Sequence, residues 1–372
     1  MKVLDSVRVL EIGGIGPGPF CAMHLADLGA DVISVVREAP NAGPTGNLLN
    51  RGKRSVTADF AQAADRDWLL RQIRDADVLV ENYKVGTLAK YGLDYASLSA
   101  LNPGLIYLSV TGFGQSGPYA SRPGYDYIFQ GMGGLMSYTG VEDGEPGAGP
   151  LRAGVAVVDL MTGMYATSAV LAALVQRGRT GQGQHLDIAL LDVAVAMNAN
   201  QASNYLVSGE SPARSGNTHP NLAPYEVFAC ADGYMILAIG NDSQFAAFCK
   251  LMGQDWHLAP EFATNAGRLT HIRQLRPLLR EQLAAWQIAE LGQALDAHGI
   301  SWGNINDLEQ VFEHPQVRHR QMLQTVQHPQ LGPLKLVRNP MVQPGQVEAI
   351  TPPPVLGPAA LPEAPHYTQQ ET

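Results

Sequence analysis

The first half of the chain alternates short runs of apolar, often β-branched residues with segments of helical spacing. The apolar runs predict strands at residues 8–12, 31–36, 77–81 and 104–110. The segments between them predict helices at 20–28 and 65–74. Strand–helix alternation at these lengths is typical of βαβ units, in which neighbouring strands run parallel. The pattern therefore predicts an α/β fold built on a mainly parallel sheet.

The pattern changes in the second half. We expect helices from Asp159 to about Val207, interrupted only by a loop at 180–184. Farther on, the runs 225–230 and 234–239 flank an Asp-Gly turn and predict a β-hairpin. Helical spacing recurs at 244–252, 275–286 and 289–298. A second, smaller α/β domain is therefore expected over residues 222–318, followed by a proline-rich, irregular tail from about Pro340.

Composition narrows the class of protein. The 372 residues, 45% of them hydrophobic and 16% charged, suffice for about two domains with sizeable cores. A net charge of −9, without a Lys/Arg run, argues against nucleic acid as the main partner. The N-terminus has no signal-like apolar region, and no 18-residue apolar run occurs. We therefore expect a cytoplasmic protein that has no membrane contact.

Metal and disulfide chemistry are not indicated. The three cysteines, Cys21, Cys230 and Cys249, form no CxxC pair, and the ten histidines form no HxxxH pair. No GxSxG motif occurs, which argues against a serine hydrolase. We therefore expect no bound metal and no permanently bound cofactor.

Asp159 is the first candidate for chemistry. It directly precedes a long apolar segment, so we expect its side chain to cap the first amides of a helix. The positive end of the helix dipole would then favour the ionised carboxylate. Such a carboxylate is either an ordinary helix cap or a nucleophile, and its own sequence context leaves both interpretations open.

The loop after the first strand, GGIGPGP at residues 13–19, lies where a dinucleotide-binding loop would lie. It does not match GxGxxG, because Pro19 or Cys21 occupies the position of the last glycine. Its prolines also remove backbone donors that a pyrophosphate would need. A nicotinamide cofactor is not expected, but a stiff loop with exposed amides suits another ligand.

Basic and aromatic residues follow several predicted strands. Arg37 ends the second strand, NRGKRS occupies 50–55, and the segment 81–93 adds Lys84, Lys90 and two tyrosines. Basic groups at the carboxyl edge of a sheet suit phosphates and a nucleotide ring. A solvated surface is the plain alternative. Tyr125 and Asp126, in a turn-rich segment, either belong to a connecting loop or reach into a cleft.

Taken together, motifs in a fixed order resemble the class III (family III) CoA-transferases, a family that includes formyl-CoA transferase and the α-methylacyl-CoA racemases. The resemblance covers roughly residues 3–330. It rests on LEI (10–12), GPGPFCAMHLADLGADVI (16–33), NRGKRS (50–55), DVLVENY (77–83), NPGLIY (102–107), GFGQSGP (112–118), Asp159 with Thr162 and Gly163, and RTGQGQ (179–184). Each motif is weak alone, and their order makes the signal strong.

The resemblance implies a mechanism and a set of site residues. Asp159 matches the nucleophilic aspartate, which forms a mixed anhydride and then an aspartyl-CoA thioester. CoA is then a substrate, exchanged between an acyl-CoA and a free carboxylic acid. Gly16 and Pro17 would line the thioester end. The residues expected along CoA are Arg37, Asn82, Tyr83, Lys90 and Tyr91.

Tyr125 distinguishes transferase from racemase. Racemases of the family carry a His-Asp pair where this chain has Tyr125 and Asp126. A tyrosine, with an ordinary pKa near about 10, is a poor base for abstracting an α-proton. The sequence therefore favours a transferase with Tyr125 at its catalytic site, acting on acids such as the dicarboxylates succinate or glutarate. The alternatives are a 2-methylacyl-CoA racemase or epimerase, in which Asp242 matches an acidic residue, and a non-catalytic CoA-binding homologue.

The family also implies an architecture. We expect an interlocked homodimer in which each chain has a Rossmann-like large domain at 1–195, completed by residues 325–372. The polar stretch 196–221 is expected to link it to the small domain, 222–318. NTHP, at 217–220, falls in the region of the family's mobile glycine-rich loop, although the glycine run itself is absent.

Overall fold

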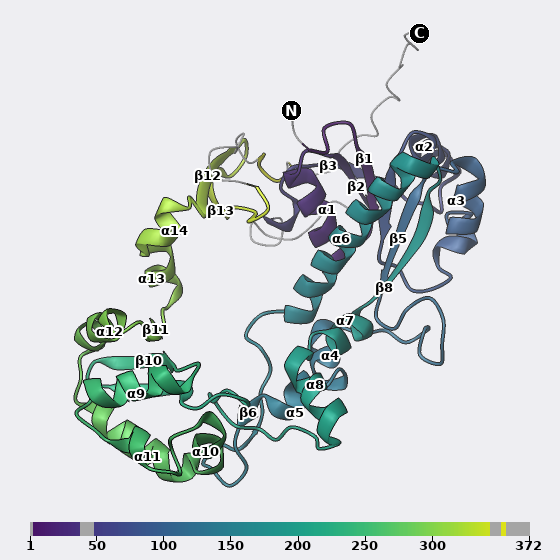
Figure 1. Ribbon diagram of the computed structural model, residues 1–372. Helices are drawn as coiled ribbons and strands as arrows, with labels where there is room; N and C mark the ends of the chain where they lie inside the picture. The colour runs from purple at the N-terminus through teal and green to yellow at the C-terminus, as the bar shows by residue number, and fades with distance from the viewer. Residues whose placement is uncertain (1–2, 38–47, 343–350, 355–372) are drawn as a thin grey trace. The chain divides into compact units, whose positions relative to one another are not determined.

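The computed structural model describes residues 3–37, 48–342 and 351–354 (Figure 1). The chain forms two compact units. Unit 1 comprises residues 1–135, 152–210 and 314–372, and unit 2 comprises 136–151 and 211–313. The division differs from the expected boundaries because 136–151 belongs to unit 2, whereas 196–210 and 314–318 belong to unit 1. Residues 343–350 and 355–372 of the expected completing segment lie outside the described residues.

A six-stranded sheet, in the order β3-β2-β1-β4-β5-β8, forms the centre of unit 1. Every pairing in it is parallel, which confirms the predicted sheet. Its strands are β1 (Arg8–Ile12), β2 (Asp31–Val36), β3 (Lys53–Thr57), β4 (Val78–Glu81), β5 (Ile106–Thr111) and β8 (Gln184–Ala189). This order is that of a doubly wound sheet, in which ligands bind beyond the carboxyl ends of the strands.

Two of these strands were not predicted. β3 begins with two basic residues, KR, and has no apolar run to mark it. β8 (QHLDIA) alternates partly buried and exposed side chains at the edge of the sheet. The expectation of helices up to Val207 with a single loop at 180–184 was therefore wrong over residues 184–189.

Helices cover both faces of the sheet (Figure 1). α1 (Pro17–Asp27) and α6 (Val157–Thr180) pack on one face, and α2 (Ala63–Arg74) and α3 (Tyr95–Leu101) on the other. α1 begins three residues earlier than predicted, with Pro17 in its first turn, where a missing N–H costs nothing. The close approach of α1 and α6 depends on Gly163, because a Cβ there would lie 2.6 Å from the Phe20 ring and 3.1 Å from the Pro17 carbonyl oxygen.

Helix α6 is long and apolar enough, by length and composition, to cross a membrane. The expectation that no 18-residue apolar run occurs is not contradicted, because Asp159, Thr162 and Gln176 interrupt the apolar residues of this helix. Its side chains Val158, Ala166, Val170 and Ala173 lie in the core of unit 1. We therefore interpret α6 as the central core helix of this unit.

The remaining elements of unit 1 are short. They are η1 (Leu48–Asn50), η2 (Leu88–Tyr91), α4 (Asp126–Met132), α7 (Leu190–Ala196), α8 (Ala199–Ser208), α14 (Pro315–His319), β12 (Leu323–His328) and β13 (Gly332–Val337). Asn339, beyond β13, donates to the His24 ring at 2.9 Å and to the Asp27 carboxylate at 3.1 Å. This contact ties the C-terminal part of the unit to helix α1.

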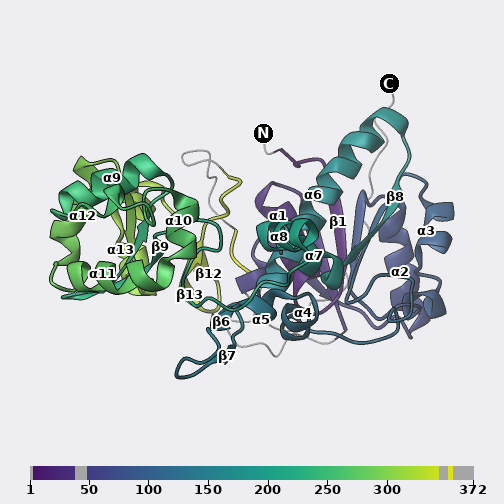
Figure 2. The same ribbon diagram turned by 60° about the horizontal axis from the view of Figure 1, so that its bottom comes forward.

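Unit 2 is built on the predicted hairpin. β9 (Tyr225–Cys230) and β10 (Gly233–Ala238) pair antiparallel, and β11 (Ser301–Asn304) adds to β10. The predicted helices are confirmed with shifted ends as α9 (Asp242–Leu251), α11 (Ile272–Ala284) and α12 (Ile288–Ala297), which lie around this sheet in Figure 2. The unit also holds α5 (Leu135–Tyr138), β6 (Gly140–Val141), β7 (Gly149–Pro150), η3 (Trp256–Leu258), α10 (Asn265–Thr270) and α13 (Leu308–Glu313).

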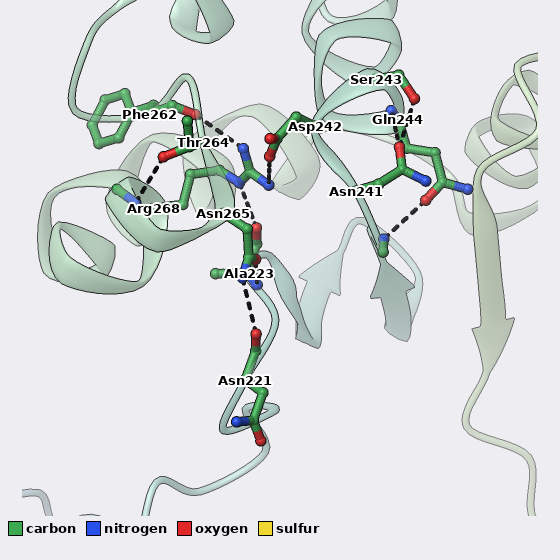
Figure 3. Close-up of polar contacts among 12 residues, drawn as sticks. Asn221, Ala223, Asn241, Asp242, Ser243, Gln244, Phe262, Thr264, Asn265 and Arg268 are labelled. Atoms are coloured by element: carbon green, nitrogen blue, oxygen red, sulfur yellow. Dashed lines mark hydrogen bonds and ion pairs between the residues drawn. The ribbon is translucent and has the colours of Figure 1, made fainter.

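A buried arginine organises the polar interior of unit 2 (Figure 3). Arg268 donates to the carbonyl oxygens of Ala223 at 2.6 Å and Phe262 at 3.1 Å, and to Asp242 Oδ1 at 2.9 Å. Asn265 contacts the same segment, just before β9, because its Oδ1 accepts from the Ala223 amide at 3.0 Å. Asp242, considered above as a racemase acid, is therefore the ion-pair partner of a buried guanidinium.

Candidate active site

Asp159 is the third residue of α6, not its cap. The N-cap position belongs to Ala156, so the predicted capping role of Asp159 was wrong. Asp126 caps the helix instead. Its Oδ1 accepts from the backbone amides of Val158 at 2.7 Å and Asp159 at 3.1 Å. The first turn of α6 is thus satisfied by a residue 33 positions away, and the Asp159 carboxylate is left out of the capping interaction.

The capping carboxylate is itself held in place. Gln130, fully buried, donates from Nε2 to Asp126 Oδ2 at 2.5 Å and accepts the Ala153 amide on Oε1 at 2.9 Å. Gln130 lies one turn after Asp126 on α4, so both side chains face the start of α6. The sequence allowed Asp126 either to belong to a connecting loop or to reach into a cleft. In the structure, its hydrogen bonds place it at the start of α6.

Two causes raise the pKa of Asp159 to about 6. Partial burial disfavours the charged carboxylate, and the neighbouring Asp126 carboxylate adds like-charge repulsion. These causes outweigh the helix dipole, which was expected to favour ionisation. Near neutral pH the carboxylate is still ionised, and it is more basic than an ordinary aspartate. Partial desolvation together with raised basicity suits a carboxylate that forms a covalent bond.

The loop at 13–16 lies against this carboxylate. Gly16 has a φ of +89°, a conformation that favours glycine. A Cβ on Gly16 would lie 3.2 Å from Asp159 Oδ2, so Gly16 lies beside the carboxylate. Pro17, buried, begins α1 directly after it. The structure therefore brings together Gly16 and Asp159, both expected at the thioester end.

Two of the residues expected along CoA, both tyrosines, lie around one aromatic side chain. The rings of Tyr83 and Tyr91 contact that of Phe60 edge-on, with centroids 6.3 and 6.4 Å away. Arg37 Nε lies 3.7 Å from the Asp59 carboxylate, and the arginine side chain is 74% exposed. Burial raises the pKa of Tyr83, and the positive charge of Arg37 opposes that rise. An exposed cation thus lies within electrostatic reach of a surface of aromatic rings.

Two further expected residues have different surroundings. Lys90 is exposed on η2. The side-chain amide of Asn82 contacts the loop at 13–16, where Nδ2 donates to the Ile15 carbonyl oxygen at 2.7 Å.

Tyr125 precedes α4 and its side chain is 79% exposed, whereas the adjacent Asp126 makes the contact with α6. Roles for Tyr125 and Lys90 stay predictions.

The NRGKRS motif does not present free cations to a ligand. Arg51 binds the Asp27 carboxylate at 2.9 and 2.7 Å, and Arg54 binds Asp31 at 2.7 Å. Lys53 is buried and donates to Glu11 at 2.6 Å. Each of these three side chains therefore has a carboxylate partner within the fold, and of the three only Arg54 is exposed.

Nothing in the described ranges forms a cluster of three or more His, Cys, Asp or Glu side chains able to hold a metal ion. The cysteines are all free thiols.

Comparison with known proteins identifies the family. Residues 4–359 match the family described as CoA-transferase family III, and the chain belongs to it. It is 45% identical over 339 residues to the succinate–glutarate CoA-transferase of Agrobacterium fabrum, covering 85% of this chain and 83% of that protein. It is 36% identical to the succinyl-CoA:glutarate CoA-transferase of Mus musculus, covering 96% and 84%.

A solved structure agrees with this assignment. A CaiB/BaiF family protein from Brucella suis is 41% identical, with 97% of each chain covered and a TM-score of 0.79. The resemblance read from the sequence motifs is thus confirmed, and the protein is an enzyme, a family III CoA-transferase. CoA thioesters are the substrates of this class. The racemase and the non-catalytic homologue gain no support, since both relatives are named as CoA-transferases.

Proposed function

We propose that the protein transfers CoA from succinyl-CoA to a second dicarboxylate such as glutarate, with Asp159 as the covalent nucleophile. The placement of Asp159 is the observation that supports its role as the nucleophile. Its carboxylate is half-buried beside Gly16, and Asp126, not Asp159, caps helix α6. The names of the relatives from Agrobacterium fabrum and Mus musculus support the choice of acids.

The reaction proceeds through two kinds of covalent intermediate. A carboxylate oxygen of Asp159 attacks the thioester carbon of succinyl-CoA, and the C–S bond breaks to give a mixed anhydride and the CoA thiolate. The thiolate attacks Cγ of Asp159 and displaces succinate, leaving an aspartyl-CoA thioester. The acceptor carboxylate then attacks Cγ and displaces the thiolate. The thiolate finally attacks the acceptor's carbonyl carbon, which releases the new acyl-CoA and restores the Asp159 carboxylate.

Each tetrahedral intermediate carries a negative oxygen that needs a donor. The loop at 13–16 brings backbone to the Asp159 carboxylate at Gly16, and the first turn of α1 follows it directly. We assign this region to the thioester end of the substrate. The exposed Arg37 and the rings around Phe60 are assigned to the nucleotide part of CoA, because guanidinium groups bind phosphates and aromatic faces bind adenine.

A homodimer of interlocked chains is part of this proposal. Helix α8 leaves Tyr205, Leu206 and Val207 exposed, with 79% of Leu206 and 90% of Val207 accessible in the single chain. A second copy would remove such apolar surface from water. Light scattering coupled to size-exclusion chromatography tests this directly, with twice the chain mass of 39.9 kDa expected and the mass of one chain contradicting it.

Kinetics of purified variants test the proposed chemistry. With succinyl-CoA and glutarate, Asp159→Ala and Asp159→Asn are expected to lose at least about 10³-fold in turnover, with the affinity for CoA changed less than about threefold. Asp67→Ala, at an exposed aspartate on α2, is the matched control and should keep wild-type rates. Turnover retained by both Asp159 variants would remove the nucleophile from the proposal.

A further inference from the structure

Asn82 follows β4 directly and lies beneath the loop at 13–16. Its side-chain amide contacts the loop at two successive residues. Oδ1 accepts from the Gly14 amide at 3.2 Å, and Nδ2 donates to the Ile15 carbonyl oxygen at 2.7 Å. Both polar atoms of the amide are thus engaged with the loop backbone, across 67 and 68 positions of sequence.

The loop is built to receive this side chain. A Cβ on Gly13 would lie 2.3 Å from Asn82 Oδ1 and 3.2 Å from its Cγ, a separation that real Cβ atoms do not adopt. Gly18, on the other side, leaves 3.5 Å between its own Cβ position and the Asn82 Cβ. Glycine at 13 therefore makes room for the Asn82 amide, whereas a Cβ on Gly14 would meet no atom within 4 Å.

The next residue of the loop is Gly16, which lies beside the Asp159 carboxylate. The hydrogen bonds to Gly14 and Ile15 end one residue before this contact. Gly16 has no side chain that would hold it, and its φ of +89° is a conformation that glycine adopts as readily as others. Gly16 is held downstream by its carbonyl oxygen, which accepts from the Phe20 amide at 3.2 Å, and the two Asn82 contacts hold the loop just upstream.

We infer that Asn82 is a positioning residue for the transferase reaction: its amide fixes the loop at 13–16 against Asp159, so that the substrate thioester and the carboxylate meet at a set distance. This inference rests on the proposed role of Asp159. It replaces the expectation that the Asn82 side chain lies along CoA. Displacement of reacting groups by about 1 Å can cost about 10²-fold in rate, so the effect belongs in kcat and not in CoA affinity.

A double-mutant cycle between Asn82 and Gly13 tests this inference. Asn82→Ala is expected to lower kcat for succinyl-CoA and glutarate by about tenfold or more, with the dissociation constant of CoA, measured by calorimetry, changed less than about threefold. Gly13→Ala should cause a similar loss in the wild-type background, because its Cβ displaces Asn82 Oδ1. The Asn82→Ala variant lacks the Oδ1 and Cγ atoms that a Cβ on Gly13 would meet, so adding Gly13→Ala should lower kcat little further. Gly178→Ala is the matched control and should keep the wild-type kcat, because Gly178 is exposed near the end of α6 and a Cβ there would meet no atom within 4 Å.

Three results would overturn the inference. They are a wild-type kcat in Asn82→Ala, a CoA dissociation constant raised about tenfold with kcat unchanged, and a Gly13→Ala loss of equal size in both backgrounds. If Asn82→Ala does not fold, Asn82→Asp serves instead. It keeps the acceptor for Gly14 and loses the donor to Ile15, so the same fall in kcat is expected and an unchanged kcat contradicts it.

Failure of this inference is separable from failure of the proposed function. Asp159→Ala that still turns over removes the nucleophile whatever Asn82 does. An inactive Asp159→Ala beside a fully active Asn82→Ala leaves the nucleophile in place and removes only the role of Asn82.

Discussion

Asp126 accepts the backbone amide of Asp159 at 3.1 Å, so that one carboxylate caps α6 and a second lies within its first turn. The cap supplies the acceptor that the first amides of a helix lack. Because Asp126 is the cap, the Asp159 carboxylate does not accept these helix amides. The same arrangement places two negative charges close together, which is one of the two reasons why the pKa of Asp159 is raised.

Removing the cap should destabilise the protein. Asp126→Ala deletes the acceptor for the Val158 and Asp159 amides and the partner of the buried Gln130. The expected loss in the free energy of unfolding is about 1–2 kcal/mol, the usual cost of a lost N-cap. Urea unfolding followed by circular dichroism measures it. Ser243→Ala, on the exposed face of α9 in unit 2, is the control, and equal midpoints for the two variants would contradict the capping role.

The rate should depend on ionisation of Asp159. Because its pKa is about 6, protonation removes the nucleophile as the pH falls through that value. We therefore expect kcat/KM to fall about tenfold for each pH unit below about 6 and to level off above about 7. Asp126→Asn removes the neighbouring charge and should move this acid limb to lower pH. An unchanged limb in that variant would show that burial alone sets the pKa.

Stability should show the opposite trend. A carboxyl group whose pKa is raised on folding from 3.8 to about 6 binds more protons in the folded state, so it lowers stability as the pH rises between these values. Asp159→Asn carries no such charge. The variant should therefore be more stable than the wild type at about pH 8, and the difference should shrink below about pH 6. A melting-temperature difference that is constant with pH would contradict the raised pKa.

Arg37 is an exposed cation whose charge acts on Tyr83, one of the two tyrosines around Phe60. Arg37→Ala should raise the dissociation constant of CoA by about tenfold, as expected for loss of one charge-assisted contact. Arg54→Ala is a matched control, because Arg54 is also exposed but binds Asp31. Calorimetry at two salt concentrations measures both, and the Arg37 effect should shrink at higher salt. Equal affinities for the two variants would exclude Arg37 from the CoA site.

Sequence patterns predicted the parts of the fold that depend on local residues. β1, β2, β4 and β5 are runs of buried apolar side chains, and the hairpin β9–β10 has its turn residues in place. β3 was missed because its first residue, Lys53, is buried through an ion pair with Glu11, 42 positions earlier. β8 was missed because an edge strand lacks a continuous apolar run.

In the candidate site, too, the sequence predicted only what local motifs mark. Asp159 and Gly16 were identified from motifs, and the structure places them side by side. The cap of α6 was assigned to the wrong aspartate, since an Asp near a helix start is the usual signal and the true cap comes from another helix. The Asn82 contact with the loop joins two strand ends that only the parallel sheet brings together. No local pattern encodes such contacts.

The most direct test of the account is mass spectrometry of the covalent intermediate. The protein is mixed with succinyl-CoA, quenched with hydroxylamine and digested. We predict a hydroxamate on the peptide that contains Asp159, absent without succinyl-CoA and absent in Asp159→Asn. Complete turnover with that peptide unmodified, or a hydroxamate on another carboxylate, would contradict Asp159 as the nucleophile.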